Sequence, residues 1–193
     1  MSAIIQPGAG ILFMKVGTHA QEGLEDIINR KSKEIEQAGF AMWGYGGNTC
    51  HPRSMVQPFA EIFEAKGQPI HLVMQEMNSK HFAEQVRASD YSEDGLTWKE
   101  IPKPINVLGS RFALVIKSLE RKEVMLPLNQ TRVPVGPSMG RLGSRYLRGQ
   151  VDKACLEVMD HSENTNEDDP KEVQINLVAE LQAPYAVFLK NTD

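Results

Sequence analysis

Short apolar runs alternate with amphipathic segments in the first 77 residues, and this alternation constrains the fold more than any other feature. The apolar runs cover residues 11–16, 40–43 and 70–74. Between them, apolar residues recur at helical spacing from Leu24 to Ala38 and from Met55 to Phe63. The order strand, helix, strand, helix, strand is typical of parallel βαβ crossovers. We therefore expect an N-terminal βαβαβ unit, with ligands beyond the carboxyl ends of its strands.

The ends of the two helices carry local signals. Thr18 and Gln21 have the spacing of a capping box, which predicts that the first helix begins near Thr18. Gly39 suits its C-terminal cap. Pro52 and Pro58 both fit a first helical position better than an interior one, so the second helix is expected to begin at one of them.

The rest of the chain indicates antiparallel strands. Residues 112–116 and 123–126 are expected to pair as a hairpin around Glu120–Lys122, which would make the sheet mixed. Asp94–Gly95 predicts a second hairpin turn. Two more strands are expected on either side of Ala183–Pro184. The expected fold class is therefore α/β, or α+β, with the βαβαβ unit continuing into a mixed sheet.

Length and composition favour one soluble domain spanning residues 1–193. The chain is 41% hydrophobic and 24% charged, and it has no apolar run of the ~20 residues that span a bilayer. Residues 160–170 are acidic and contain no hydrophobic side chain, which predicts a flexible loop. The N-terminus resembles no signal peptide, so we expect a cytoplasmic protein with two reduced cysteines. The net charge of −4 makes nucleic acid an unexpected partner, and homo-oligomerisation stays open.

The glycine-rich stretch at residues 42–53 is the first candidate site. Glycine lets a backbone or ligand approach closely, and a neighbouring aromatic ring offers a face for stacking. The candidate ligand-binding residues in this stretch are Trp43, Tyr45, Gly46, Gly47, Asn48 and Arg53. The alternative is a tight turn with both aromatic rings in the core. No phosphate-loop motif is present, and the stretch lacks the third glycine of the dinucleotide fingerprint.

Three arginines form the second candidate site. Arg141, Arg145 and Arg148 are spaced so that a helix would align them on one face. The planar guanidinium donates two parallel hydrogen bonds to a phosphate and stays charged. The alternative is a solvated face that pairs with the acidic loop at residues 160–170.

Histidines provide the catalytic alternative. His19 follows the first strand and His51 follows the glycine-rich turn, so either could act as an acid–base group. His71, within an apolar run, is expected to be a core residue. The cysteines and histidines show no metal-ligand spacing, and no cofactor is expected.

These patterns predict a protein that binds a small phosphorylated or nucleotide-like ligand, with no membrane partner. An enzyme acting on such a ligand, a hydrolase or transferase with a histidine acid–base, is the first alternative. A protein–protein interaction module without a small-molecule site is the second.

Overall fold

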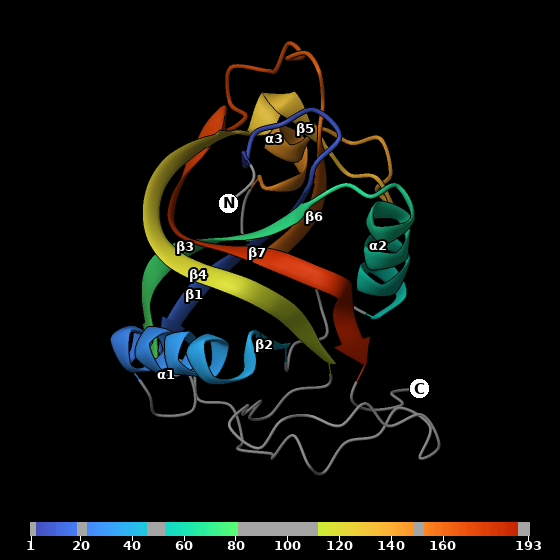
Figure 1. The fold of residues 1–193 in the computed structure, drawn as a ribbon. Helices are drawn as coiled ribbons and strands as arrows, with labels where there is room; N and C mark the ends of the chain where they lie inside the picture. The colour runs from blue at the N-terminus through green and yellow to red at the C-terminus, as the bar shows by residue number, and fades with distance from the viewer. Residues whose placement is uncertain (1–2, 19–22, 46–52, 81–111, 149–152, 189–193) are drawn as a thin grey trace.

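The computed structural model describes residues 3–18, 23–45, 53–80, 112–148 and 153–188 (Figure 1). These residues form a mixed α/β fold around a seven-stranded sheet, with strand order β2-β4-β7-β3-β1-β6-β5. The strands are β1 Gly10–Thr18, β2 Ala41–Tyr45, β3 Ile70–Lys80, β4 Phe112–Pro127, β5 Thr131–Arg132, β6 Lys153–Val158 and β7 Glu172–Phe188. The helices are α1 Leu24–Ala38, α2 Arg53–Ala65, the 3-10 turn η2 Leu128–Gln130, and α3 Gly143–Tyr146.

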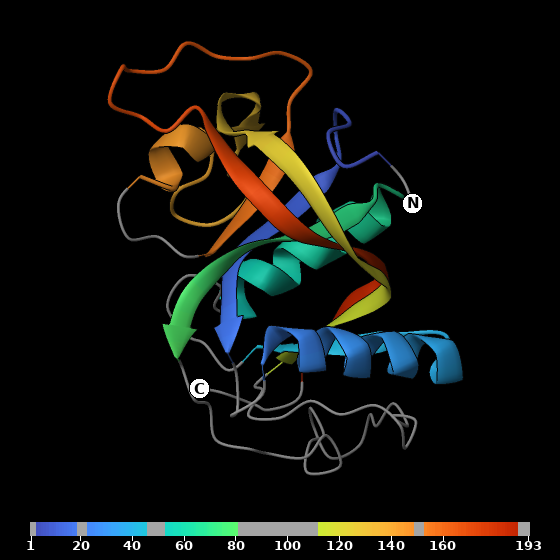
Figure 2. The same ribbon diagram turned by 90° about the vertical axis from the view of Figure 1, so that its left-hand side faces the viewer.

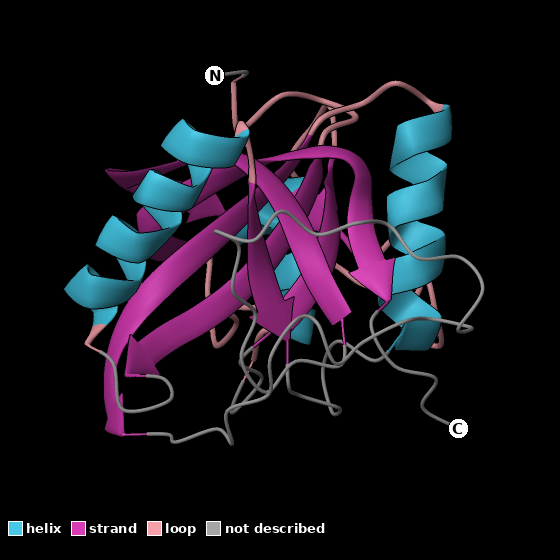
Figure 3. Ribbon diagram, turned by 60° about the horizontal axis from the view of Figure 1, so that its bottom comes forward, coloured by secondary structure: helices cyan, strands magenta, loops and turns pink. Residues whose placement is uncertain are grey.

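The centre of the sheet is the parallel pair predicted from the sequence. β1 pairs with β3 in parallel and with β6 antiparallel. Consecutive residues of β1 and β3 are buried. Figure 3 shows the sheet between the two long helices, α1 and α2. At Gly10, a Cβ atom would lie 3.0 Å from the rings of Phe59 and Phe63, so the missing side chain lets α2 pack closely.

Helix α1 ends as predicted but begins later. Gly39 is the C-terminal cap, with φ 83°, and its N–H donates to the Ile35 carbonyl at 2.8 Å. The predicted start at Thr18 is wrong, because Thr18 is the last residue of β1 and is paired with Lys80. Gly23 takes the N-cap position instead. Strand pairing therefore overrides the capping-box signal.

Helix α2 begins at Arg53, directly after Pro52, and includes Pro58 in its interior. A start as late as Pro58 is therefore wrong. Proline removes one helical hydrogen bond, yet Val56, Phe59 and Phe63 are all fully buried on the same helix. This continuous apolar face stabilises the helix on both sides of Pro58.

The C-terminal half contains two long strands where the sequence suggests four short ones. β4 runs without a hairpin through Glu120–Lys122 and pairs antiparallel with β7. The polar triplet marks a shift of register between Arg121 and Val124, since three steps of β4 there match two of β7. The expected break between two strands at Ala183–Pro184 is also wrong, because β7 continues through it with a cis peptide bond. The pairing of β7 with β4 shifts register there, opposite the step from Leu114 to Ile116. The two strands bend strongly along their length (Figure 1).

Strand β2 lies at the edge of the sheet, next to β4, and is not a neighbour of β1 or β3. The sheet curls, however, and the carboxyl ends of β1, β2 and β3 all lie at the same end of the molecule as α1 (Figures 1 and 2). We call this the strand-end region. Helix α3, η2 and β5 lie at the opposite end (Figure 1).

The hairpin predicted around Asp94–Gly95 falls outside the described residues. Within the described part of the chain, the helices are too short or too polar to cross a membrane.

Candidate functional site

The strand-end region contains the glycine-rich candidate site, and its described part is core. Trp43 in β2 is 5% exposed and belongs to the hydrophobic core, opposite Leu114 of β4. Its ring therefore offers no exposed face to a ligand. Gly44 and the Tyr45 backbone continue the ladder opposite Ala113 and Phe112.

The other candidate residues of this region lie outside the described residues. His19, Gly46, Gly47, Asn48 and His51 are not among the described residues, and the same holds for the side chains of Tyr45 and Arg53.

Their described neighbours in sequence can be located. Strand β1 ends at Thr18, β2 ends at Tyr45 and α2 begins at Arg53. These ends of the two strands and this end of the helix lie at the strand-end side of the molecule (Figures 1 and 2).

An ion-pair network that the sequence did not reveal also lies here. The Arg121 guanidinium on β4 contacts Glu25 in the first turn of α1 and Glu76 on β3, the latter at 3.2 Å. Asn176 of β7 accepts a hydrogen bond from the Glu76 backbone N–H. The hydrogen bond to Glu25, followed by the one to Glu76, raises the pKa of Arg121. The partners are 45 and 96 residues from Arg121, too distant for a local motif to indicate them.

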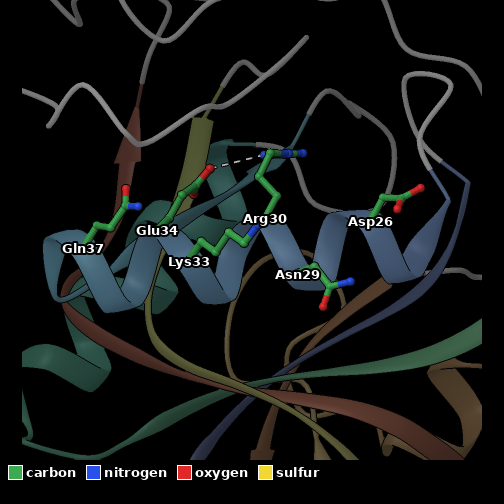
Figure 4. A pocket seen from close by; sticks show the side chains of 6 residues that line it. All are labelled: Asp26, Asn29, Arg30, Lys33, Glu34 and Gln37. Atoms are coloured by element: carbon green, nitrogen blue, oxygen red, sulfur yellow. Dashed lines mark hydrogen bonds and ion pairs between the residues drawn. The ribbon is translucent and has the colours of Figure 1, made fainter.

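A polar groove runs along α1 with a volume of about 440 Å³ (Figure 4). Its lining residues are Asp26, Asn29, Arg30, Lys33, Glu34 and Gln37. Glu34 is buried and forms ion pairs with Lys31 at 3.0 Å and Arg30 at 3.3 Å. The lining holds two acids and two bases, so it has no excess of positive charge for an anion.

The arginine candidates lie at the opposite end, around α3. Arg145 Nε is 3.7 Å from Asp169 Oδ2, and Arg148 Nη1 is 3.5 Å from Asp169 Oδ1. Both arginine side chains are more than half exposed, at 57% and 58%, whereas the Asp169 side chain is 1% exposed. Two guanidiniums therefore converge on one buried carboxylate.

The arginines do not share a helical face as predicted. Helix α3 has only four residues, Gly143–Tyr146, so Arg141 precedes it and Arg148 follows it. Arg141 lies in a turn, where its N–H donates to Ser138 at 3.0 Å and its carbonyl accepts from Val133 at 2.8 Å. Its side chain is exposed.

Close packing fixes α3 against η2 and β5. A Cβ atom on Gly143 would lie 2.1 Å from Thr131 Oγ1 and 3.1 Å from the Leu128 carbonyl oxygen. Thr131 is buried and donates its hydroxyl to that same carbonyl at 2.9 Å. Ser144, next along α3, is fully buried, and its Oγ has no hydrogen-bond partner in the described part of the chain.

The acidic loop is solvated along most of its length, as expected, but Asp169 near its end is buried. Upstream, the Glu163 N–H donates to the Asn129 carbonyl at 2.9 Å. His161 contacts Asp160 at 2.6 Å and Glu163 at 2.9 Å. The hydrogen bonds to Asp160 and then Glu163 raise the pKa of His161, and the bond to His161 lowers the pKa of Asp160.

A histidine and a cysteine of the described chain lie in the core. His71 is fully buried on β3, as predicted. Cys155 is a free, buried cysteine on β6, and burial raises the pKa of its thiol. The described ranges contain no cluster of three or more His, Cys, Asp or Glu residues suited to a metal ion.

The structure thus joins Arg145 and Arg148 through Asp169. Strand β2, which contains Trp43, and helix α3, which contains Arg145, lie at opposite ends of the molecule (Figure 1). The sequence predicted that the arginines could pair with the acidic loop, but it did not identify Asp169, because nothing in the loop sequence indicates which carboxylate is buried. No family model, curated protein or solved structure matches the chain.

Proposed function

We propose that the chain binds a small phosphate-bearing ligand through Arg141, Arg145 and Arg148. The observation that carries this proposal is the convergence of two half-exposed guanidiniums on the buried Asp169 carboxylate. A carboxylate is itself an oxyanion, so this arrangement already suits one. Guanidinium groups bind phosphate by paired N–H donors, and each arginine retains exposed donors beyond Asp169.

Charge supports an additional anion at this cluster. The two arginines that reach Asp169, Arg145 and Arg148, against that one carboxylate give +2 − 1 = +1. The α1 groove is less suitable, because its two bases face two acids. A phosphorylated metabolite as ligand would also fit the cytoplasmic location expected from the sequence.

The arginines would hold the phosphate part of a ligand. A nucleotide base usually stacks on an exposed aromatic ring. Trp43 is buried, and its strand β2 lies at the opposite end of the fold from α3, so it does not support base binding beside the arginines.

The test uses isothermal calorimetry with inorganic phosphate, pyrophosphate and a nucleoside triphosphate at constant ionic strength. Arg141→Ala is the main variant, because the contacts of Arg141 described above are made by its backbone and folding should be unaffected. We expect it to weaken binding about tenfold, typical of a lost charge-assisted hydrogen bond.

Arg132→Ala is the matched control, since Arg132 is an exposed arginine nearby that pairs with Glu157 at 3.0 Å. It should bind as the wild type does. Equal affinity of both variants and the wild type, or a flat titration with all three probes, would overturn the proposal. A flat titration would favour the interaction-module alternative.

The enzyme alternative belongs to the strand-end region. It is supported by the common end at which β1 and β2 terminate, directly before the segments containing His19 and His51 (Figures 1 and 2). Any compound that binds would be incubated with the protein and analysed for turnover. Loss of turnover in His19→Ala or His51→Ala, with binding retained, would assign the acid–base group.

A further inference from the structure

The ion pairs of Asp169 leave this buried carboxylate poorly satisfied. A carboxylate accepts several hydrogen bonds, and in the described chain Asp169 receives one side-chain hydrogen bond, from Arg148 at 3.5 Å. The Asp169 Oδ2 atom receives no hydrogen bond from the part of the chain that the structure describes, and Arg145 Nε lies 3.7 Å from it, within ion-pair distance. The Ser144 Oγ, on the same helix as Arg145, is also buried and has no hydrogen-bond partner among the described residues. Under-satisfied buried polar groups are rare in native proteins and often mark a functional position.

Asp169 is held by a short turn at the end of an exposed segment. Its backbone N–H donates to the Asn166 carbonyl at 3.1 Å. The residues before it, Glu167 and Asp168, are exposed. Downstream, the chain is fixed where the Leu128 N–H donates to the Lys171 carbonyl at 2.9 Å. The position of the carboxylate therefore depends on one turn between exposed residues and an anchored strand.

We propose that Asp169 is an internal competitor at the arginine cluster, and that a bound phosphate group displaces its carboxylate from Arg145 and Arg148. This inference rests on the function proposed above and adds its regulation. A phosphate offers more acceptor oxygens to the two guanidiniums than one carboxylate does. The acidic segment would thus keep the cluster occupied until a stronger oxyanion arrives.

Asp169→Asn provides the first test, by calorimetry with pyrophosphate. Removing the competing charge should tighten binding about tenfold, as expected for one charge a few ångströms from the ligand. Asp168→Asn is the matched control, because it removes the same charge from the adjacent exposed position. It should change affinity by less than about twofold, since exposed charges are screened. Asp169→Glu, which keeps the charge, should bind like the wild type.

A second measurement uses the wild-type chain and does not depend on the folding of a variant. Hydrogen exchange at the Asp169 amide should become faster with saturating pyrophosphate, because displacement of the side chain loosens the turn to Asn166. The Lys171–Leu128 contact should keep its protection.

The outcomes separate the two proposals. Binding to the wild type, with equal affinities for Asp169→Asn and Asp168→Asn and with unchanged exchange, would overturn the displacement inference alone. Absence of binding by the wild type and by Asp169→Asn would overturn the arginine site itself.

Discussion

The two ends of the molecule carry the same charge pattern with opposite signs. Around α3, one acid, Asp169, lies between two bases, Arg145 and Arg148. At the strand-end region, one base, Arg121, lies between two acids, Glu25 and Glu76. The central groups differ in exposure: the Asp169 side chain is 1% exposed and that of Arg121 is 42% exposed.

This difference in burial gives the two networks different roles. The Arg121 ion pairs join α1, β3 and β4 at the surface. Because water solvates Arg121 and its partners, these pairs contribute little to the free energy of unfolding. Asp169 has lost its water and depends on the arginines, whose other donors face solvent. The α3 network can therefore respond to an external anion, whereas the Arg121 network is a surface link.

The largest effect is expected from a change in the packing that holds α3 in place. Gly143→Ala would place a Cβ atom 2.1 Å from Thr131 Oγ1, and we expect a loss of about 2–3 kcal/mol in the free energy of unfolding. Gly23→Ala is the counterpart at the strand end, where the new Cβ would meet only Asp26 Oδ2 at 3.5 Å. It should lose less than about 1 kcal/mol. Urea denaturation measures both, and equal losses would contradict the described packing of α3.

The effect of burial is tested next by removing one arginine from a fully buried acid and one from a partly buried acid. Arg148→Ala leaves Asp169 with a single partner, and we expect a destabilisation of about 2 kcal/mol. Arg132→Ala removes the partner of Glu157, which is 15% exposed, and should cost less than about 1 kcal/mol. Thermal unfolding of both variants at one pH decides. A smaller destabilisation for Arg148→Ala than for Arg132→Ala would show that the fold does not depend on the ion pair between Asp169 and Arg148.

The sequence predicted the elements whose signals are local. Periodicity was sufficient for β1, α1, β2, α2 and β3, and Gly39 correctly marked a helix end. The prediction of two short strands in place of β4 was wrong. Glu120–Lys122 resembles a turn in sequence, but pairing with β7 keeps the strand continuous. That pairing joins segments about 60 residues apart, as in the Ser118–Glu180 hydrogen bond, so no local pattern could reveal it.

The candidate site was predictable to a similar extent. The arginines were visible as a local cluster of positive charge in an acidic chain. Asp169 was not distinguishable from Asp168, since only the tertiary fold decides which of two adjacent carboxylates is buried. The separation of Trp43 from Arg145 likewise depends on the order of strands in the sheet, which periodicity does not encode.

A smaller effect is expected at the strand end from Arg121→Ala. The side chains of Arg121, Glu25 and Glu76 are all more than two-fifths exposed, so the variant should lose about 1 kcal/mol or less. The loss should shrink further in 1 M salt, where screening acts within about 3 Å. Urea denaturation at low and high salt measures it. A loss matching that of Arg148→Ala would remove the contrast between the two networks.

His161, like Arg121, is a base between two acids, but it titrates near neutral pH. The smallest effect on stability is expected here. It lies in solvent between Asp160 and Glu163, whose hydrogen bonds raise its pKa, Asp160 having the larger effect. Because the pKa is raised in the folded state, the pairing stabilises the fold fully below the ordinary histidine value, about 6.5. This contribution is lost as the pH rises through the raised value. The lowered pKa of Asp160 has the opposite consequence, so its contribution is lost as the pH falls through that lowered value.

Titration of the His161 ring by NMR tests this pairing directly. Asp160→Asn should lower the pKa of His161 towards the ordinary value, and Glu163→Gln should lower it by a smaller amount. Glu167→Gln removes an equal charge from the same exposed segment and should leave the titration nearly unchanged, because exposed charges are screened. If all three variants shift the titration equally, the raised pKa reflects the general negative charge of the segment. An unshifted titration in Asp160→Asn would mean that the 2.6 Å contact does not persist in solution.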